Sequence, residues 1–163
     1  MTRATLTLDL PTLTATAGFA GRLAPLLRGG DVMLLCGPMG AGKTALARAL
    51  IGALRDRAGL PPEDVPSPTF TLVQTYDTGP FETWHADLYR LSDPSEVTEL
   101  GLDEAFRDAL CLIEWPDRLG ADAPTDALHV ALQPLADETR RLALTGPDDT
   151  LRRLAPAFAK DSR

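Results

Sequence analysis

The sequence predicts an α/β fold in which a mixed sheet of parallel and antiparallel strands is covered by helices on both faces. Two apolar runs, residues 31–36 and 110–114, are continuous, as in strands that are buried on both sides. Strand-like and helix-like segments alternate along much of the chain, which favours an α/β arrangement. The length of 163 residues suits a single domain over residues 1–163, whose last few residues are expected to be mobile.

The first part of the chain is expected to supply an edge strand, two helices and a buried strand. Residues 5–8 alternate between polar and apolar side chains, as a short edge strand does. Residues 12–27 carry large apolar side chains at helical spacing, and Gly29-Gly30 ends that helix. The buried strand 31–36 follows, and residues 45–58 form a helix rich in Ala, Leu and Arg.

The middle of the chain predicts a hairpin and an interrupted helix. Residues 69–76 and 81–88 read as two strands joined by a turn that contains Gly and Pro. Ser92 is the expected N-cap of the next helix, with Pro94 in its first turn. The helical pattern is interrupted near Gly101 and then resumes.

The last part of the chain predicts strands and a terminal helix. The strand 110–113 ends at Glu114, residues 128–132 and 142–144 form a second hairpin, and residues 147–159 form the helix.

Charge argues against a protein that grips nucleic acid by itself. The net charge is −7, whereas neutralising a phosphate backbone needs a basic face. Four arginines, Arg140, Arg141, Arg152 and Arg153, lie near the C-terminus, and a solvated surface is favoured over a nucleic-acid patch. The sequence has no apolar run of the roughly 18 residues that a membrane span needs, and no signal peptide is evident. We therefore expect a cytoplasmic protein without membrane contact.

The most informative motif follows the first buried strand and matches the pattern G-x-x-x-x-G-K-[ST] of a phosphate-binding P-loop. Its residues, with the first one of the following helix, are Gly37, Pro38, Met39, Gly40, Ala41, Gly42, Lys43, Thr44 and Ala45. Glycines let the backbone N–H groups surround phosphate oxygens, and the helix adds the positive end of its dipole. Lys43 would contact the β- and γ-phosphates, and the Thr44 hydroxyl would bind Mg²⁺. The motif predicts a three-layer P-loop NTPase fold that binds a nucleoside triphosphate.

Lysine usage supports this interpretation. Only Lys43 and Lys160 among the 16 basic residues are lysines, so the chain keeps a compact ammonium group at the P-loop. The Asn-Lys-x-Asp segment with which GTPases read guanine is absent from the sequence, so ATP is the expected nucleotide.

Two acidic residues are candidates for the chemistry. Glu114 ends a buried strand, which is where P-loop enzymes hold the metal or its waters. Asp87 lies in a second strand-like run. It could orient the attacking water, or it could form a salt bridge or cap a turn, and the residues favour neither interpretation. His85 should share the face of Asp87, and a structural role is favoured for it. Thr69 could approach the γ-phosphate, although its spacing favours a β-branched residue that simply begins a strand.

Five segments occur in an order that resembles one family: residues 37–44, 67–73, 85–91, 99–104 and 111–116. They resemble the bacterial tRNA threonylcarbamoyladenosine biosynthesis protein TsaE family, also known as the YjeE family of P-loop ATPases. The resemblance extends from about residue 10 to residue 118, and any base contact from Arg140 or Arg141 lies beyond it. The family usually has Asp-Leu where this chain has Pro38-Met39, and Phe where it has Ala86. Pro38 removes one N–H group from the phosphate loop.

The resemblance implies a function and a set of roles. Members are small ATPases that bind TsaB and TsaD, the proteins that attach a threonylcarbamoyl group to an adenosine beside the tRNA anticodon, and they support turnover by hydrolysing ATP. The resemblance implies that Lys43 contacts phosphates, that Thr44 and Glu114 serve Mg²⁺, and that Asp87 and Thr69 lie near the γ-phosphate. It further implies that Trp115 borders the nucleotide or the partner surface and that Thr16 helps to wall the base. Contact with tRNA would be indirect.

Two other functions remain open on the sequence. A small-molecule kinase would also carry a P-loop, although such enzymes usually begin with it and have an arginine-rich lid. A nucleotide-dependent binding module without useful turnover would need the P-loop but neither Asp87 nor Glu114.

Overall fold

The structure is a computed structural model that describes residues 3–93 and 95–159. The expectations that Pro94 lies in a first helical turn and that residues 160–163 are mobile fall outside the described residues.

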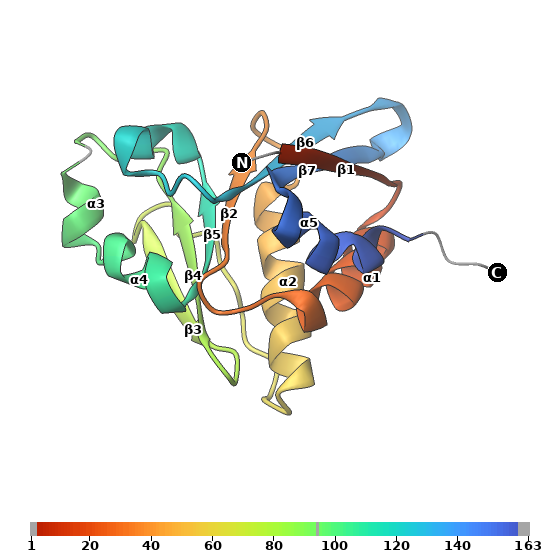
Figure 1. The fold of residues 1–163 in the computed structure, drawn as a ribbon, viewed down its shortest axis with the longest axis horizontal. Helices are drawn as coiled ribbons and strands as arrows, with labels where there is room; N and C mark the ends of the chain where they lie inside the picture. Colours follow the sequence, from red (N-terminus) through yellow and green to blue (C-terminus); the bar gives the residue numbers. More distant parts are fainter. Residues whose placement is uncertain (1–2, 94, 160–163) are drawn as a thin grey trace.

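A seven-stranded sheet with the order β1-β7-β6-β2-β5-β4-β3 forms the centre of the fold (Figure 1). Strand β2 pairs in parallel with β5 and β6, and β4 pairs in parallel with β5. The β1–β7, β6–β7 and β3–β4 pairs are antiparallel, so the prediction of a mixed sheet is confirmed. The strands are β1 (Arg3–Leu10), β2 (Val32–Cys36), β3 (Val73–Asp77), β4 (Glu82–Asp87), β5 (Leu110–Glu114), β6 (Leu128–Pro134) and β7 (Arg140–Pro147).

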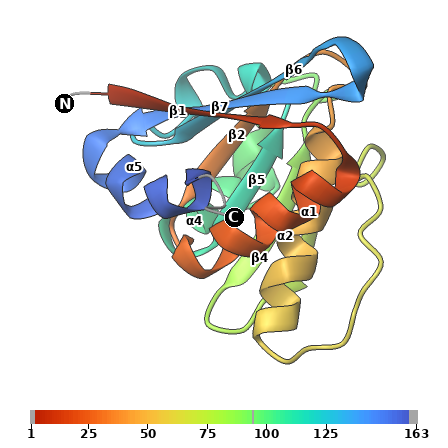
Figure 2. The same cartoon turned by 90° about the vertical axis from the view of Figure 1, so that its right-hand side faces the viewer.

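Helices cover both faces of the sheet, as the sequence predicted. Helices α1 (Leu13–Leu23), α2 (Lys43–Arg57) and α5 (Asp148–Leu154) lie on one face, and the short helices α3 (Glu96–Glu99) and α4 (Leu102–Asp108) lie on the other (Figure 1). Within residues 3–93 and 95–159 there are also four 3-10 helices: η1 (Ala24–Leu26), η2 (Pro116–Asp122), η3 (Ala136–Glu138) and η4 (Ala155–Phe158). In the view of Figure 2, β1, β7 and β6 form the upper end of the sheet above α1 and α5.

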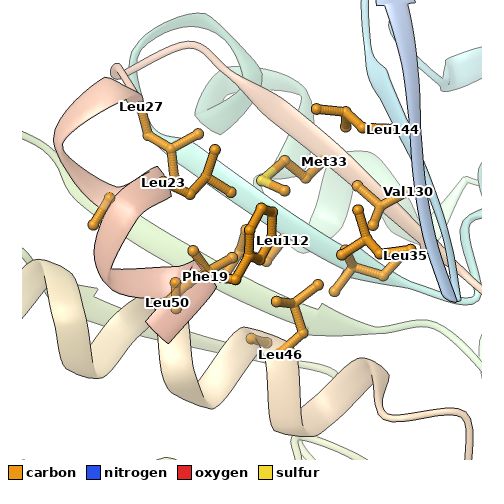
Figure 3. Packing of buried hydrophobic residues seen from close by; sticks show 14 of the residues in the cluster. Phe19, Leu23, Leu27, Met33, Leu35, Leu46, Leu50, Leu112, Val130 and Leu144 are labelled. Carbon is orange, nitrogen blue, oxygen red and sulfur yellow. The ribbon is translucent and has the colours of Figure 1, made fainter. Parts of the chain in front are cut away.

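Strand β2 divides its apolar side chains between two cores. Met33 and Leu35 join the larger core with α1 and α2, where Phe19 from α1 lies among them (Figure 3). Val32 and Leu34 point to the other face and join the core beneath α4. Burial on both faces explains why residues 31–36 are apolar without alternation.

The predicted strand over residues 69–76 begins four residues too early. Residues 69–72 form a turn, in which Leu72 has a φ of 66° and its N–H donates to the carbonyl of Pro68 at 2.7 Å. A left-handed residue cannot continue a strand, so β3 starts at Val73. The rest of the prediction is confirmed, because β3 and β4 form an antiparallel hairpin.

The predicted helix start at Ser92 is also displaced. Helix α3 begins at Glu96, and the Ser92 hydroxyl instead donates to the Glu96 carboxylate at 2.7 Å. The expected interruption at Gly101 is confirmed, because Gly101 has a φ of 84° between α3 and α4. At the C-terminus, the predicted helix over residues 147–159 is α5 followed by η4.

Three of the four C-terminal arginines contact carboxylates rather than forming a basic patch. Arg153 binds both carboxylate oxygens of Asp31 at 2.7 and 2.9 Å, and its side chain is only 17% exposed. Arg141 pairs with Asp9, and the exposed Arg152 lies 3.5 Å from Asp149. Arg153 therefore departs from the expected solvated surface and connects α5 to the start of β2. Among the described residues, no helix is long and apolar enough to cross a membrane.

Candidate functional site

The P-loop connects the end of β2 to the start of α2, as the motif predicted. Gly37, Gly40 and Gly42 all have positive φ values, of 151°, 81° and 102°. A Cβ atom on Gly37 would lie 2.6 Å from the carbonyl oxygen of Leu132 on β6, so a larger residue would push against the sheet. Pro38 is exposed and its carbonyl accepts a hydrogen bond from Ala41 N at 3.1 Å. The backbone therefore turns tightly between β2 and α2, as the glycines of the motif allow.

Lys43 is buried at the first turn of α2, with 5% of its surface exposed. Its ammonium group donates to the Gly37 carbonyl at 2.6 Å and lies 3.6 Å from the centroid of the Trp115 ring. Burial lowers the pKa of Lys43, and the carboxylates of Glu114 and Asp87 oppose that shift. The ammonium group thus stays beside two negative charges and an aromatic face, which favour its charged form.

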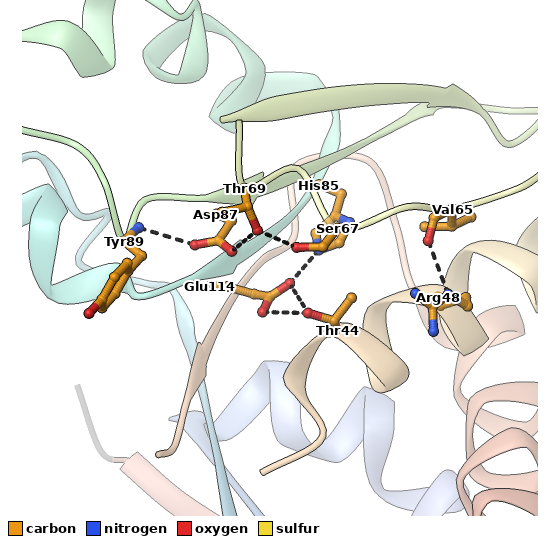
Figure 4. Close-up of polar contacts among 9 residues, drawn as sticks. All are labelled: Thr44, Arg48, Val65, Ser67, Thr69, His85, Asp87, Tyr89 and Glu114. Carbon is orange, nitrogen blue, oxygen red and sulfur yellow. Dashed lines mark hydrogen bonds and ion pairs between the residues drawn. The ribbon is translucent and has the colours of Figure 1, made fainter. Parts of the chain in front are cut away.

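Glu114 ends β5 directly opposite the P-loop and is 2% exposed. Its carboxylate accepts hydrogen bonds from the Thr44 hydroxyl at 2.8 and 2.9 Å (Figure 4). The Nε2 atom of His85 lies 2.6 Å from Oε2 of the same carboxylate. Parallel pairing brings these groups together, because β5 lies between β2 and β4 in the sheet.

Asp87 ends β4 and is paired in register with Glu114 on β5. One carboxylate oxygen accepts a hydrogen bond from the backbone N–H of Tyr89 at 3.1 Å, and the other lies 3.5 Å from the Thr69 hydroxyl. The hydroxyls of Thr69 and Ser67 are 2.7 Å apart (Figure 4). No carboxylate–base ion pair involving Asp87 occurs among the described residues, so the salt-bridge interpretation of this residue has no support there. The bond from the Tyr89 N–H, two residues further on, is a turn-capping contact, so that interpretation is confirmed.

These side chains meet at a cavity of about 480 Å³. It is lined by Met39, Gly40, Gly42, Lys43, Thr44, Ala45, Ser67, Thr69, Asp87, Tyr89, Arg90, Glu114 and Trp115. All three predicted catalytic residues and both predicted metal ligands therefore border one space. Trp115, which the resemblance placed at the nucleotide or the partner, lies in its wall.

Thr16 lies elsewhere, in a second cavity of about 330 Å³. Ala45 and Gly42 border both cavities, so the two spaces adjoin the start of α2. Arg140 lines the second cavity and donates to the Gly40 carbonyl at 3.3 Å. Arg141 is instead paired with Asp9 and does not line it. Thr16 therefore lies apart from Asp87 and Glu114, and its role beside the base stays a prediction.

The loop that carries Ser67 and Thr69 is held against α2 by two arginines. Arg48 donates to the Val65 carbonyl at 3.0 Å, and Arg55 donates to the carbonyls of Pro61 and Asp77 (Figure 4 for Arg48). Val65 itself is buried. These contacts bring a segment without regular secondary structure to the edge of the cavity.

Sequence reasoning did not assign roles to Ser67, Tyr89 and Arg90, which also line the cavity. Tyr89 packs on Trp115 with ring centroids 5.0 Å apart, and Arg90 lies 4.8 Å from the ring of the exposed Phe70. They lie two and three residues after Asp87, so proximity in the chain was the available signal. His85 was assigned a structural role, and its contact with Glu114 could not be read from its position in the sequence.

The donors at the cavity fit a phosphate group and a magnesium ion. Thr44 and Glu114 offer oxygen atoms, which Mg²⁺ prefers, and Lys43 offers N–H groups to phosphate. The described residues contain no cluster of three or more His, Cys, Asp or Glu side chains that could hold a metal by themselves. A site with one carboxylate and one hydroxyl suits a cation that takes its other ligands from phosphates and water.

Comparisons with known proteins identify the family of the chain. The family model "Threonylcarbamoyl adenosine biosynthesis protein TsaE" matches residues 10–142, which is further than the resemblance to about residue 118. A tRNA threonylcarbamoyladenosine biosynthesis protein TsaE of Rickettsia bellii is 39% identical over 130 residues, covering 80% of this chain and 88% of that protein. The protein of that name from Bacillus subtilis is 34% identical over 131 residues, covering 80% and 78%.

A solved structure shares the fold. The crystal structure of Bacillus subtilis YdiB superposes with a TM-score of 0.76 at 24% sequence identity and covers 97% of this chain and 96% of that one. The family model and the sequence identity to these relatives point to the same family, and the P-loop opposite Glu114 is consistent with it. The chain belongs to the TsaE family of threonylcarbamoyladenosine biosynthesis proteins.

Proposed function

We propose that this chain is a Mg²⁺-dependent ATPase that supports threonylcarbamoyladenosine modification of tRNA by binding TsaB and TsaD. The observation that carries the proposal is the meeting of Lys43, Thr44, Glu114 and Asp87 at one cavity in a chain of the TsaE family. A loop that only binds an anion would need Lys43 and Thr44 but neither carboxylate. The two carboxylates at the same cavity add what such a loop lacks, namely groups that can hold a cation or orient water.

The two cavities accommodate different parts of ATP. The phosphates would lie in the first cavity against the P-loop and Lys43, and the base would lie in the second beside Thr16 and Arg140. Gly42 and Ala45 border both spaces, so a nucleotide can pass across the start of α2. The helix N-terminus then faces the phosphates, where its dipole stabilises negative charge.

Thr44 and Glu114 would hold Mg²⁺ directly or through its waters. The bound ion would neutralise charge on the phosphate oxygens. Glu114 already accepts the Thr44 hydroxyl hydrogen, which leaves the hydroxyl lone pairs free for a cation. The two ligands are therefore arranged before any metal arrives.

Asp87 is the group that would orient the attacking water. Its carboxylate ends the strand beside Glu114, and the Tyr89 N–H fixes one oxygen. The other oxygen faces the Thr69 hydroxyl at a distance too long for a strong hydrogen bond, so it retains the capacity to accept one from water. Thr69 would then stand beside the γ-phosphate, held in place through Ser67.

A protein partner, rather than tRNA itself, fits the surface around the cavity. Met39, Phe70 and Tyr89 are 71%, 83% and 44% exposed, and all lie at or beside the cavity. Exposed apolar side chains at one place favour a protein interface. With a net charge of −7, the chain would leave tRNA contacts to its partners. We also propose a cytoplasmic location, because tRNA is modified there in bacteria.

Co-purification tests the partnership. Tagged chain is incubated with purified TsaB and TsaD, with and without ATP and Mg²⁺, and the retained proteins are quantified. Wild-type chain should retain both partners and should do so more strongly with nucleotide. Lys43→Ala should lose the nucleotide dependence, because phosphate binding is lost. Failure of the wild-type chain to retain either partner would refute the partnership, and phosphorylation of a metabolite in a substrate screen would favour the kinase alternative.

A further inference from the structure

His85 is a buried polar residue that the proposed mechanism does not yet use. It lies within β4 and has no exposed surface. Its Nε2 atom is 2.6 Å from Oε2 of Glu114, and its Nδ1 atom has no hydrogen-bond partner among the described residues. A histidine buried only for packing would not need such a short contact with a carboxylate.

The direction of this hydrogen bond follows from the partner. A carboxylate has no hydrogen to give, so Nε2 of His85 carries the hydrogen and donates it to Glu114. This choice leaves Nδ1 with an unpaired lone pair rather than an unpaired N–H group, which is the less costly of the two. Glu114 therefore accepts hydrogen bonds from two elements at once: from Thr44 on α2 and from His85 on β4.

These two donors determine how the carboxylate is oriented. Thr44 lies between the two oxygens, at 2.8 and 2.9 Å, and alone would allow the group to tilt about that contact. His85 binds only Oε2 and so fixes which oxygen is turned toward β4 (Figure 4). Oε1 then keeps lone pairs for a ligand on the cavity side.

We propose that His85 is a positioning residue that fixes Glu114 for Mg²⁺ binding. The proposal rests on the proposed function, in which Glu114 serves the metal. His85 acts only through Glu114 and is not a catalytic residue, since it is covered by its neighbours and does not line the cavity. Loss of a hydrogen-bonding partner behind a metal ligand typically weakens metal affinity by about 10- to 100-fold.

The test measures Mg²⁺-dependent nucleotide binding rather than activity. Binding of a non-hydrolysable ATP analogue is followed by calorimetry at increasing Mg²⁺ concentrations. His85→Leu and His85→Asn both remove a donor at the Nε2 position, and each should raise the Mg²⁺ concentration for half-maximal binding about 10-fold or more. His85→Gln can place an amide N–H near that position and should remain close to wild type. Binding without Mg²⁺ should be the same for all.

The matched control is Thr83→Val. Thr83 lies two residues earlier on β4, is fully buried and bonds to Thr78 rather than to the site. This variant also loses a buried polar contact and should show wild-type Mg²⁺ dependence. If His85→Leu does not fold, His85→Asn carries the same expectation. Wild-type Mg²⁺ dependence in a folded His85→Leu or His85→Asn variant would overturn the proposal.

Glu114→Gln separates this proposal from the proposed function. If Glu114→Gln weakens Mg²⁺-dependent binding and the His85 variants do not, the role of His85 is wrong while the metal assignment stands. If Glu114→Gln itself leaves the Mg²⁺ dependence unchanged, the metal assignment fails, and the proposal for His85 fails with it.

Discussion

Asp87 and Glu114 occupy equivalent places at the ends of neighbouring strands, yet their surroundings differ. Glu114 is held by two side-chain donors, whereas Asp87 has one backbone donor and a weak contact with Thr69. A carboxylate with firmly held oxygens suits the fixed coordination that Mg²⁺ demands. A carboxylate with free accepting capacity suits the orientation of water. The two residues can therefore serve different roles although they are adjacent in the sheet.

Asp87→Asn tests the role of the second carboxylate. The amide keeps the shape of the side chain, but with its single oxygen on the Tyr89 N–H it turns an NH2 group, which accepts no hydrogen bond, toward the water. ATP hydrolysis should therefore fall about 100-fold or more. Nucleotide affinity should change little, because the P-loop is untouched. Steady-state phosphate release and calorimetric binding measure the two effects. Glu82→Gln, at the exposed start of the same strand, is the control and should hydrolyse ATP like wild type.

Site residues could be predicted from the sequence where they belong to a motif or end a buried strand. Lys43 and Thr44 follow from the P-loop pattern, and Glu114 follows from its place after a buried strand. The residues alone left the role of Asp87 undecided and favoured a structural role for His85, because the distance of His85 from Glu114 depends on the pairing of β4 with β5. This pairing brings together His85 and Glu114, which are 29 positions apart, and no local pattern encodes it.

At the scale of elements, the sequence predicted types and order well and boundaries less well. Unbroken runs of apolar residues identified β2 and β5, and Gly101 was correctly predicted to separate α3 from α4. The start of β3 was wrong because Leu72 adopts a positive φ, which nothing in a leucine side chain indicates. Tertiary contacts explain this turn, since the Leu72 carbonyl accepts the N–H of Asp87 at 2.9 Å.

The junction before β2 provides a test of packing between elements. A Cβ atom on Gly29 would collide with the Asp108 carbonyl oxygen at the end of α4 and would lie 3.2 Å from Cβ of Phe81. Gly29→Ala should therefore lower the free energy of unfolding by about 2 kcal/mol. Gly52→Ala, in the exposed middle of α2 with nothing within 4 Å, should raise it by about 0.5–1 kcal/mol. Urea unfolding of both variants measures these opposite changes in the free energy of unfolding. Changes in the same direction in the two variants would contradict this explanation of the packing.

The connection between α5 and β2 gives a second test at this scale. Arg153 makes two charged hydrogen bonds to Asp31 and a third to the Leu26 carbonyl in a partly buried position. Arg153→Ala should lower the free energy of unfolding by about 2–3 kcal/mol. The neighbouring Arg152 is 79% exposed and its pair with Asp149 contributes little, so Arg152→Ala should change stability by less than about 0.5 kcal/mol. If Arg153→Ala and Arg152→Ala lowered the free energy of unfolding by similar amounts, α5 would not be held through Asp31.

At the scale of the whole molecule, the order of strands brings distant parts of the chain to one edge. Four segments meet where the parallel strands end: the P-loop, the loop that carries Ser67 and Thr69, the end of β4 at Asp87, and the end of β5 at Glu114 and Trp115. The fold class and the mixed sheet were predictable from apolar patterning. The second cavity was not, because Thr16 and Arg140 are 124 positions apart and meet only through the packing of α1 and β7 around the P-loop.

We propose that this site hydrolyses ATP and responds to TsaB and TsaD. The most direct measurement is phosphate release from ATP with Mg²⁺ by the purified chain, alone and with the two partners. We predict slow release by the chain alone, a clear increase with both partners, and loss of that increase in Asp87→Asn. Rapid release by the chain alone that is indifferent to TsaB and TsaD would contradict the account.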